Sequence, residues 1–192
     1  MVKTENFEKV EVQSAAQLRD WLNINHTQKE SIWLVTYKKQ VADKYVSISE
    51  VLDELLCFGW IDGIRRKLDE DKTMQLISPR QTQHWAQTYK VRFAKLDKKG
   101  LVADAGKASV TKSKANGSWN FMDDVDALIK PTDFIQCLEE NPPAMINFDK
   151  FGASGKRFIL RWIKLSKTPE TRAKRIKEAA ELAAKNLKIP GL

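Results

Sequence analysis

Cysteine, histidine and long apolar runs are scarce in this sequence, and each scarcity excludes a class of protein. Two cysteines in 192 residues, with no CxxC pair, are too few for a disulfide framework. The two histidines, His26 and His84, lie in no HExxH motif, and no metal-ligand cluster is evident. No stretch approaches the ~18 apolar residues of a membrane-spanning helix, and the charged amino-terminal segment lacks the apolar core of a secretory signal. We therefore expect a cytoplasmic protein without a transmembrane segment, cofactor or metal ion.

Catalytic motifs are missing as well. The sequence has no GxSxG element and no dinucleotide-binding fingerprint. The run from Gly100 to Ala108 is only superficially similar to a P-loop, because its spacing is one residue too long and alanine replaces the serine or threonine. We expect no catalytic residue, and an enzyme of unknown type is a third hypothesis.

Positive charge is abundant and unevenly placed. The chain has 33 Lys and Arg against 25 Asp and Glu, and residues 150–192 hold 12 of the former and 3 of the latter. A basic segment of this kind favours nucleic acid, acidic lipid or phosphorylated partners. The alternative interpretation is a solvated, lysine-rich helix face. The residues that would serve a nucleic-acid or membrane partner are Arg161, Lys164, Arg172 and Arg175.

Alternating and helical patterns predict an α+β amino-terminal domain over residues 1–118. Ser14 and Ser47 are expected to cap helices, and Gly59 is expected to end the second of them. The apolar run 31–37 is typical of a central strand. Residues 60–68 and 73–78, joined by a polar turn, predict a hairpin that completes a small, mainly antiparallel sheet.

The rest of the chain is predicted to be helical. Apolar residues from about Thr82 onward recur at helical spacing, with Trp85 at the start of the stripe. Residues 119–192 are expected to form a separate helical region. Its helices are predicted to begin near Pro131, Asn141, Ser154 and Thr168.

The hairpin strand 60–68 contains charged residues among apolar ones. Alternate residues of a strand point to the same face. This strand is therefore predicted to point Trp60, Asp62, Ile64, Arg66 and Leu68 to the same face.

This arrangement predicts a small anion-binding pocket. Asp62 could orient Arg66 and Arg80 so that their guanidinium groups face a carboxylate or phosphate. Trp60 and Trp85 could form the walls. The alternative is a structural Asp–Arg ion pair, because buried charges require partners in either case.

Three runs carry a resemblance to a known family: CFGWIDGIRRKLD, then SPR followed by a tryptophan, then LRWIKLSKTPETRAKRI. Together they resemble the YdeI/OmdA family, which is labelled bacteriocin-protection or OmpD-associated, from about Trp33 to Leu187. The chain departs from the family pattern at His84, Ala86 and Tyr89, where relatives usually carry Ser, Ser and Asn.

The resemblance implies a role in envelope stress or in resistance to antimicrobial peptides, and no settled enzymatic activity. Direct capture of a cationic peptide is disfavoured, because a protein of net charge +8 repels it. The leading hypothesis is therefore a non-enzymatic stress or resistance protein with a small anionic-ligand pocket. The alternative is a nucleic-acid or acidic-membrane binder that acts through the basic carboxyl-terminal helices.

Overall fold

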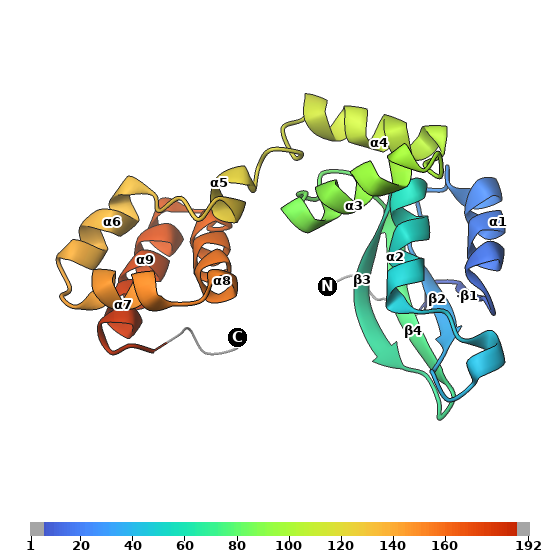
Figure 1. Ribbon diagram of the computed structural model, residues 1–192, viewed down its shortest axis with the longest axis horizontal. Coiled ribbons are helices and arrows are strands. Elements are labelled where there is room, and N and C mark those ends of the chain that lie inside the picture. Colours follow the sequence, from blue (N-terminus) through green and yellow to red (C-terminus); the bar gives the residue numbers. More distant parts are fainter. Residues whose placement is uncertain (1–5, 188–192) are drawn as a thin grey trace. The chain divides into compact units, whose positions relative to one another are not determined.

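The computed structural model describes residues 6–187 and divides into two compact units, the first ending at Asn120 and the second beginning at Phe121 (Figure 1). The first unit combines a mainly antiparallel sheet with helices, and the second is helical. The predicted α+β fold class is therefore confirmed.

The sheet of the first unit has four strands in the order β1-β2-β4-β3. β1 runs parallel to β2, and the other neighbours are antiparallel. The sequence analysis missed β1, because three residues with two charges among them give no alternating apolar pattern. The strands are β1 (Lys9–Glu11), β2 (Ile32–Tyr37), β3 (Trp60–Lys67) and β4 (Lys72–Pro79).

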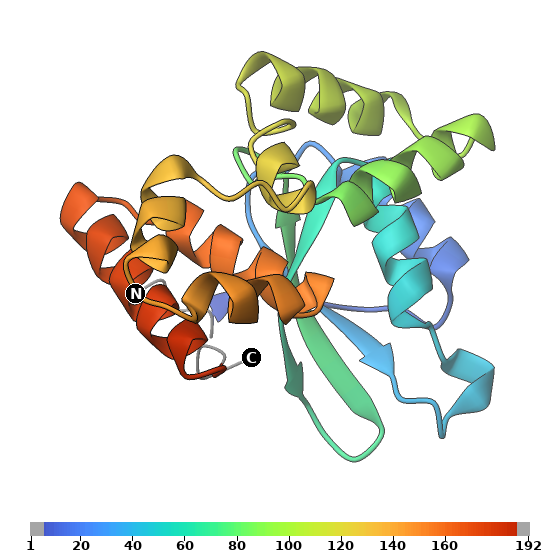
Figure 2. The same ribbon diagram turned by 60° about the vertical axis from the view of Figure 1, so that its left-hand side comes forward.

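Two capped helices cover one face of this sheet (Figures 1 and 2). The Ser14 side chain caps α1 (Ala15–Asn25), as predicted. Ser47 and Glu50 form the predicted capping box of α2 (Ile48–Cys57), which follows a short 3-10 turn over Ala42–Lys44. The core between helices and sheet contains Leu18, Leu22, Ile32, Leu34, Leu55, Leu56, Trp60 and Ile77.

Two further helices, α3 (Gln87–Lys98) and α4 (Asp104–Ala115), complete the first unit. α3 begins later than the helical spacing suggested, so His84 and Trp85 precede the helix. The Trp85 backbone N–H instead donates to the Ser118 carbonyl at 3.2 Å. Gly59 ends α2, as predicted, and its φ of +70° is a left-handed conformation that suits glycine.

The second unit is built from α5 (Asp123–Asp126), α6 (Thr132–Glu139), α7 (Ala144–Lys150), α8 (Ala153–Lys164) and α9 (Pro169–Ala184). Thr168 caps α9 ahead of a proline at the first helical position, as predicted, whereas α8 is preceded by Gly152 and not capped by Ser154. The core contains Phe134, Leu138, Phe148, Ile159, Ile163 and Ala180. Over residues 6–187, no helix combines the length and the apolar character needed to cross a membrane.

Candidate functional site

A β-bulge in β3 decides which charged side chains share a face with Asp62. Asp62 pairs with Ile77, whereas Arg65 pairs with Gln75, so β3 carries one extra residue between these two pairs. Residues opposite each other in a ladder lie on the same face, and a one-residue shift reverses the faces that follow. Asp62 therefore shares its face with Arg65, and Arg66 lies on the opposite face. The prediction that Asp62 and Arg66 point together is wrong, because alternation along a sequence does not reveal a bulge.

Asp62 instead joins a hydrogen-bonded network that links β3, β4 and α3. The Tyr89 hydroxyl donates to Asp62 Oδ1 at 3.0 Å, and Gln75 Nε2 donates to Asp62 Oδ2 at 3.4 Å. Arg65 Nη2 donates to Gln75 Oε1 at 3.0 Å. Burial raises the pKa of the Tyr89 phenol, and the neighbouring Asp62 charge raises it further.

Arg80 is enclosed against an aromatic ring. Only 7% of its surface is exposed, and its guanidinium carbon lies 4.1 Å from the centre of the Trp85 ring. Nη1 donates to the Gln83 carbonyl at 3.2 Å, while Nε has no hydrogen-bond partner. Burial lowers the pKa of Arg80 to about 10, although the neighbouring Tyr89 and Asp62 act to raise it. The guanidinium group is therefore held inside the unit and does not face an open hollow.

The two tryptophans predicted to form the pocket walls are core residues. Trp60 and Trp85 are each 1% exposed. Trp60 Nε1 donates to the His26 carbonyl at 3.3 Å, and Trp85 packs against Trp119 with ring centres 4.8 Å apart. None of the cavities of about 370, 260 and 50 Å³ found among residues 6–187 is lined by Asp62, Arg66 or Arg80. A ligand-binding role for these residues stays a prediction, and their geometry resembles a structural cluster.

Acidic side chains of the second unit neutralise two of the four basic residues that the sequence analysis singled out. Lys164 forms an ion pair with Asp124 at 2.5 Å, and Arg172 donates from Nε and Nη2 to both oxygens of Asp133 at 2.7 and 2.9 Å. The Arg172 bonds lower the pKa of Asp133.

The other two basic residues differ from each other. The Arg175 guanidinium group donates to the Trp162 carbonyl and lies 5.1 Å from the centre of its ring, whereas Arg161 is exposed. Residues 121–192 hold 13 Lys and Arg against 10 Asp and Glu. The basic excess in the sequence of residues 150–192 therefore does not become an equally basic surface, because α5, α6 and α7 supply carboxylates.

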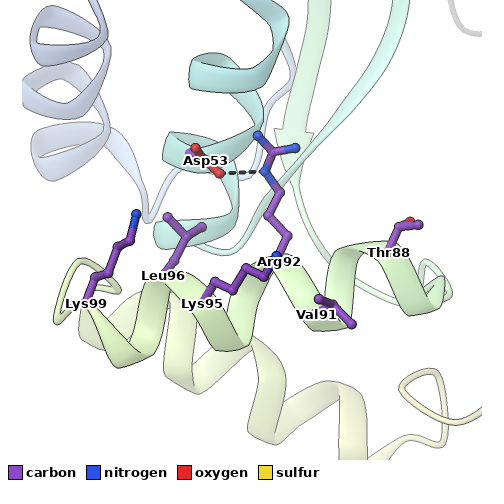
Figure 3. A pocket seen from close by; sticks show the side chains of 7 residues that line it. All are labelled: Asp53, Thr88, Val91, Arg92, Lys95, Leu96 and Lys99. Atoms are coloured by element: carbon purple, nitrogen blue, oxygen red, sulfur yellow. Dashed lines mark hydrogen bonds and ion pairs between the residues drawn. The ribbon is translucent and has the colours of Figure 1, made fainter.

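The largest of the three cavities is a groove beside α3 (Figure 3). Its volume is about 370 Å³, and we call it the α2–α3 groove. One face of α3 lines it, because residues three and four apart lie together on a helix. Its lining residues are Asp53 of α2, Lys99 directly after α3, and Thr88, Val91, Arg92, Lys95 and Leu96 of α3.

The charges of this groove are only partly neutralised. Arg92 Nε donates to Asp53 Oδ1 at 2.5 Å, and Arg92 Nη2 donates to the Ser49 carbonyl at 2.9 Å, which ties α3 to α2. Lys95 and Lys99 are exposed and form no ion pair with any described residue. The groove therefore presents two free ammonium groups one helical turn apart. The sequence analysis missed it, although the spacing of 88, 92, 95 and 99 was visible in the sequence.

No group of three or more His, Cys, Asp or Glu side chains within residues 6–187 is placed to hold a metal ion. The groove offers ammonium and guanidinium donors and a single carboxylate that is already bound to Arg92. These groups suit an anion.

Comparison with known protein families assigns each unit. The family described as "Domain of unknown function (DUF8412)" matches residues 10–109, more than half of the chain. The family described as "Bacteriocin-protection, YdeI or OmpD-Associated" matches residues 127–186. The chain therefore belongs to the first of these families, and its residues 127–186 are similar to the second. No curated protein and no solved structure matches it.

The extent of the YdeI/OmdA resemblance is narrower than the sequence analysis expected. The YdeI/OmdA match contains α6 to α9, whereas the hairpin and the α2–α3 groove fall within the DUF8412 match. The ion pair between Arg172 and Asp133 lies in the YdeI/OmdA region. The GWID motif of the hairpin therefore lies within the DUF8412 match and outside the YdeI/OmdA match.

Proposed function

We propose that this protein binds small, multiply charged anions in the α2–α3 groove and catalyses no reaction there. One observation carries the proposal: the groove contains three cationic side chains and one carboxylate, and two of the cations have no acidic partner among residues 6–187. The spacing of the lysines along the helix favours a ligand with two anionic groups, because Lys95 and Lys99 are four residues apart on one face.

The walls of the groove add a second preference. Leu96 is buried at the groove floor, and Val91 is 44% exposed beside it. A ligand with two anionic groups and a small apolar part would contact both the lysines and these side chains. Arg92 is held by Asp53 and Ser49, so it contributes a fixed positive charge without having to be ordered on binding.

The description "Bacteriocin-protection" of the second family supports a role in resistance to antimicrobial peptides. At a net charge of +8 the protein repels a cationic peptide, so we place the ligand among anions and not among the peptides themselves. In this proposal the protein acts in resistance by sensing or sequestering an anionic metabolite.

Isothermal titration calorimetry with inorganic pyrophosphate tests the proposal. We expect binding to the wild type that weakens as salt is added, because the ammonium groups are exposed. The double variant Lys95→Gln/Lys99→Gln should lose at least about tenfold in affinity, which corresponds to a loss of ~1.4 kcal/mol in binding free energy.

A charge-matched control separates the groove from general electrostatic attraction. Lys39→Gln/Lys98→Gln removes two exposed lysines that do not line the groove, and its affinity for pyrophosphate should stay near that of the wild type. Thermal unfolding of all three proteins verifies that they are folded. Absence of any binding by the wild type, or an equal loss in both double variants, would contradict the proposal.

A further inference from the structure

A second basic segment of the chain contains two consecutive helices of the first unit. Residues 87–115, which contain α3 and α4, hold eight Lys and Arg and only two acidic residues, Asp97 and Asp104. This segment therefore has a net charge of +6, compared with +8 for the whole protein. We call the exposed lysines of this segment that lie outside the α2–α3 groove the α3–α4 lysine surface.

These lysines differ in their freedom from Lys164 and Arg172 of the second unit, whose residues 121–192 have a net charge of only +3. Lys98, Lys107 and Lys114 are exposed, and no ion pair with a described residue neutralises them. In the second unit, by contrast, Lys164 and Arg172 are bound to carboxylates. The surface with the greater capacity to attract a polyanion therefore lies on the first unit.

An aromatic ring lies between the two helices of this surface. Trp119 is partly exposed, and the ammonium groups of Lys90 and Lys114 lie 5.2 and 5.3 Å from the centre of its ring. Trp85 supports the ring from within the unit, with centres 4.8 Å apart. Lys107 and Lys114 are seven residues apart in α4, so they lie on the same helix face two turns apart. The lysines of both helices thus converge on an indole ring.

We propose that the α3–α4 lysine surface binds single-stranded nucleic acid, with phosphates on Lys107 and Lys114 and a base stacked against Trp119. Single-strand binding combines a basic track for the backbone with aromatic rings for the bases, and it needs no sequence-specific contacts. The proposal is independent of the groove, because Lys107, Lys114 and Trp119 do not line it.

A membrane surface fits these observations less well. Helices that bind membranes present Trp, Phe or Leu on the face opposite their charges. α4 exposes no large apolar side chain, and over the segment 87–115 only Val91 and Leu101 are exposed residues of this kind. The aromatic residue of this surface lies beside the lysines and not opposite them.

Fluorescence anisotropy with a labelled single-stranded oligothymidylate of about 20 nucleotides tests the proposal, since single-strand sites span up to ~16 nucleotides per domain. We expect binding at low salt, with an affinity that falls linearly on a double-logarithmic plot as salt rises. Lys107→Gln/Lys114→Gln should weaken binding at least about fivefold and reduce the salt slope by about 0.7 for each phosphate contact removed.

Two further variants distinguish charge from stacking. Trp119→Leu should lower the affinity by about tenfold while leaving the salt slope unchanged, because it removes a stacking contact and no charge. Lys29→Gln/Lys39→Gln removes two exposed lysines elsewhere in the first unit and should change neither quantity. If Trp119→Leu fails to fold, the two lysine pairs still decide the question.

Pyrophosphate binding by Lys107→Gln/Lys114→Gln should equal that of the wild type, so this proposal and the groove proposal can fail separately. The nucleic-acid proposal is overturned if the wild type shows no anisotropy change at low salt. It is also overturned if both lysine pairs weaken binding equally, or if the protein binds phosphatidylglycerol vesicles and not the oligonucleotide.

Discussion

Replacement of Gly106 by alanine should separate α4 from α2 and destabilise the first unit. A Cβ atom at Gly106 would lie 2.3 Å from the Cys57 carbonyl oxygen and 2.9 Å from Val102 Cγ1. The same carbonyl oxygen accepts the Ala103 backbone N–H at 3.0 Å. The two helices therefore meet backbone to backbone, and the oxygen cannot move aside without losing its hydrogen bond.

The size of the effect follows from three opposing contributions. Alanine favours a helix interior over glycine by about 1 kcal/mol. Forcing an extra carbon into a packed interface costs about 1–3 kcal/mol. Weakening the hydrogen bond from Ala103 to Cys57 costs a further ~1 kcal/mol. We therefore expect Gly106→Ala to lower the free energy of unfolding of the first unit by about 2 kcal/mol.

Urea unfolding followed by amide hydrogen exchange in α2 and α4 measures this quantity for the first unit separately. Ala108→Gly is the matched control, because Ala108 is exposed in the same helix and reports helix propensity without packing. It should cost about 1 kcal/mol. If Gly106→Ala is as stable as the wild type or more stable while Ala108→Gly shows its expected loss, the close helix contact is refuted.

Two further predictions concern charged side chains. The pKa of Arg80 is lowered to about 10, so the folded state disfavours its charge at pH 7 by about 3 kcal/mol. Arg80→Met should therefore leave the first unit as stable as the wild type or more stable. Arg80→Ala should instead destabilise the first unit by about 2 kcal/mol, because it leaves a cavity. A loss above ~1 kcal/mol in the methionine variant, measured by urea unfolding, would show that stacking on Trp85 outweighs burial. In the second unit, Arg172 lowers the pKa of Asp133, so their pair stabilises the fold above pH ~4 and this contribution disappears as the pH falls through the lowered pKa of Asp133. Arg172→Met should lower the free energy of unfolding by about 0.5–1 kcal/mol at pH 7 and leave it unchanged well below that pKa. The control Lys174→Met should change the free energy of unfolding at neither pH. A loss of stability in Arg172→Met that persists in acid would contradict the ion-pair account.

Local signals in the sequence were sufficient to predict individual helix boundaries. Ser47 and Glu50 predicted a capping box, and Thr168 with Pro169 predicted the start of α9, and both are present. These signals are reliable because the atoms that bond lie within four residues of each other. The same holds for Gly59, whose left-handed conformation depends on its own backbone.

The candidate site could not be predicted in the same way. The faces of β3 depend on its register with β4, and the extra residue between Asp62 and Arg65 is defined only by the paired strand. Trp60 and Trp85 were assigned as pocket walls, but packing against the helices and against Trp119 encloses both. A tryptophan beside a charge looks the same in a sequence whether it lines a cavity or a core.

The distribution of charge shows this division most clearly. The sequence by itself determined the α+β fold class, the caps of α1, α2 and α9 and the net positive charge, because these depend on composition and on neighbours along the chain. Only the tertiary structure decided which cations are free: Lys164 and Arg172 meet carboxylates about 40 residues away, whereas Lys95 and Lys99 meet none among the described residues. The physical reason is that a charge is neutralised by what lies within a few ångströms in space, and folding sets those distances.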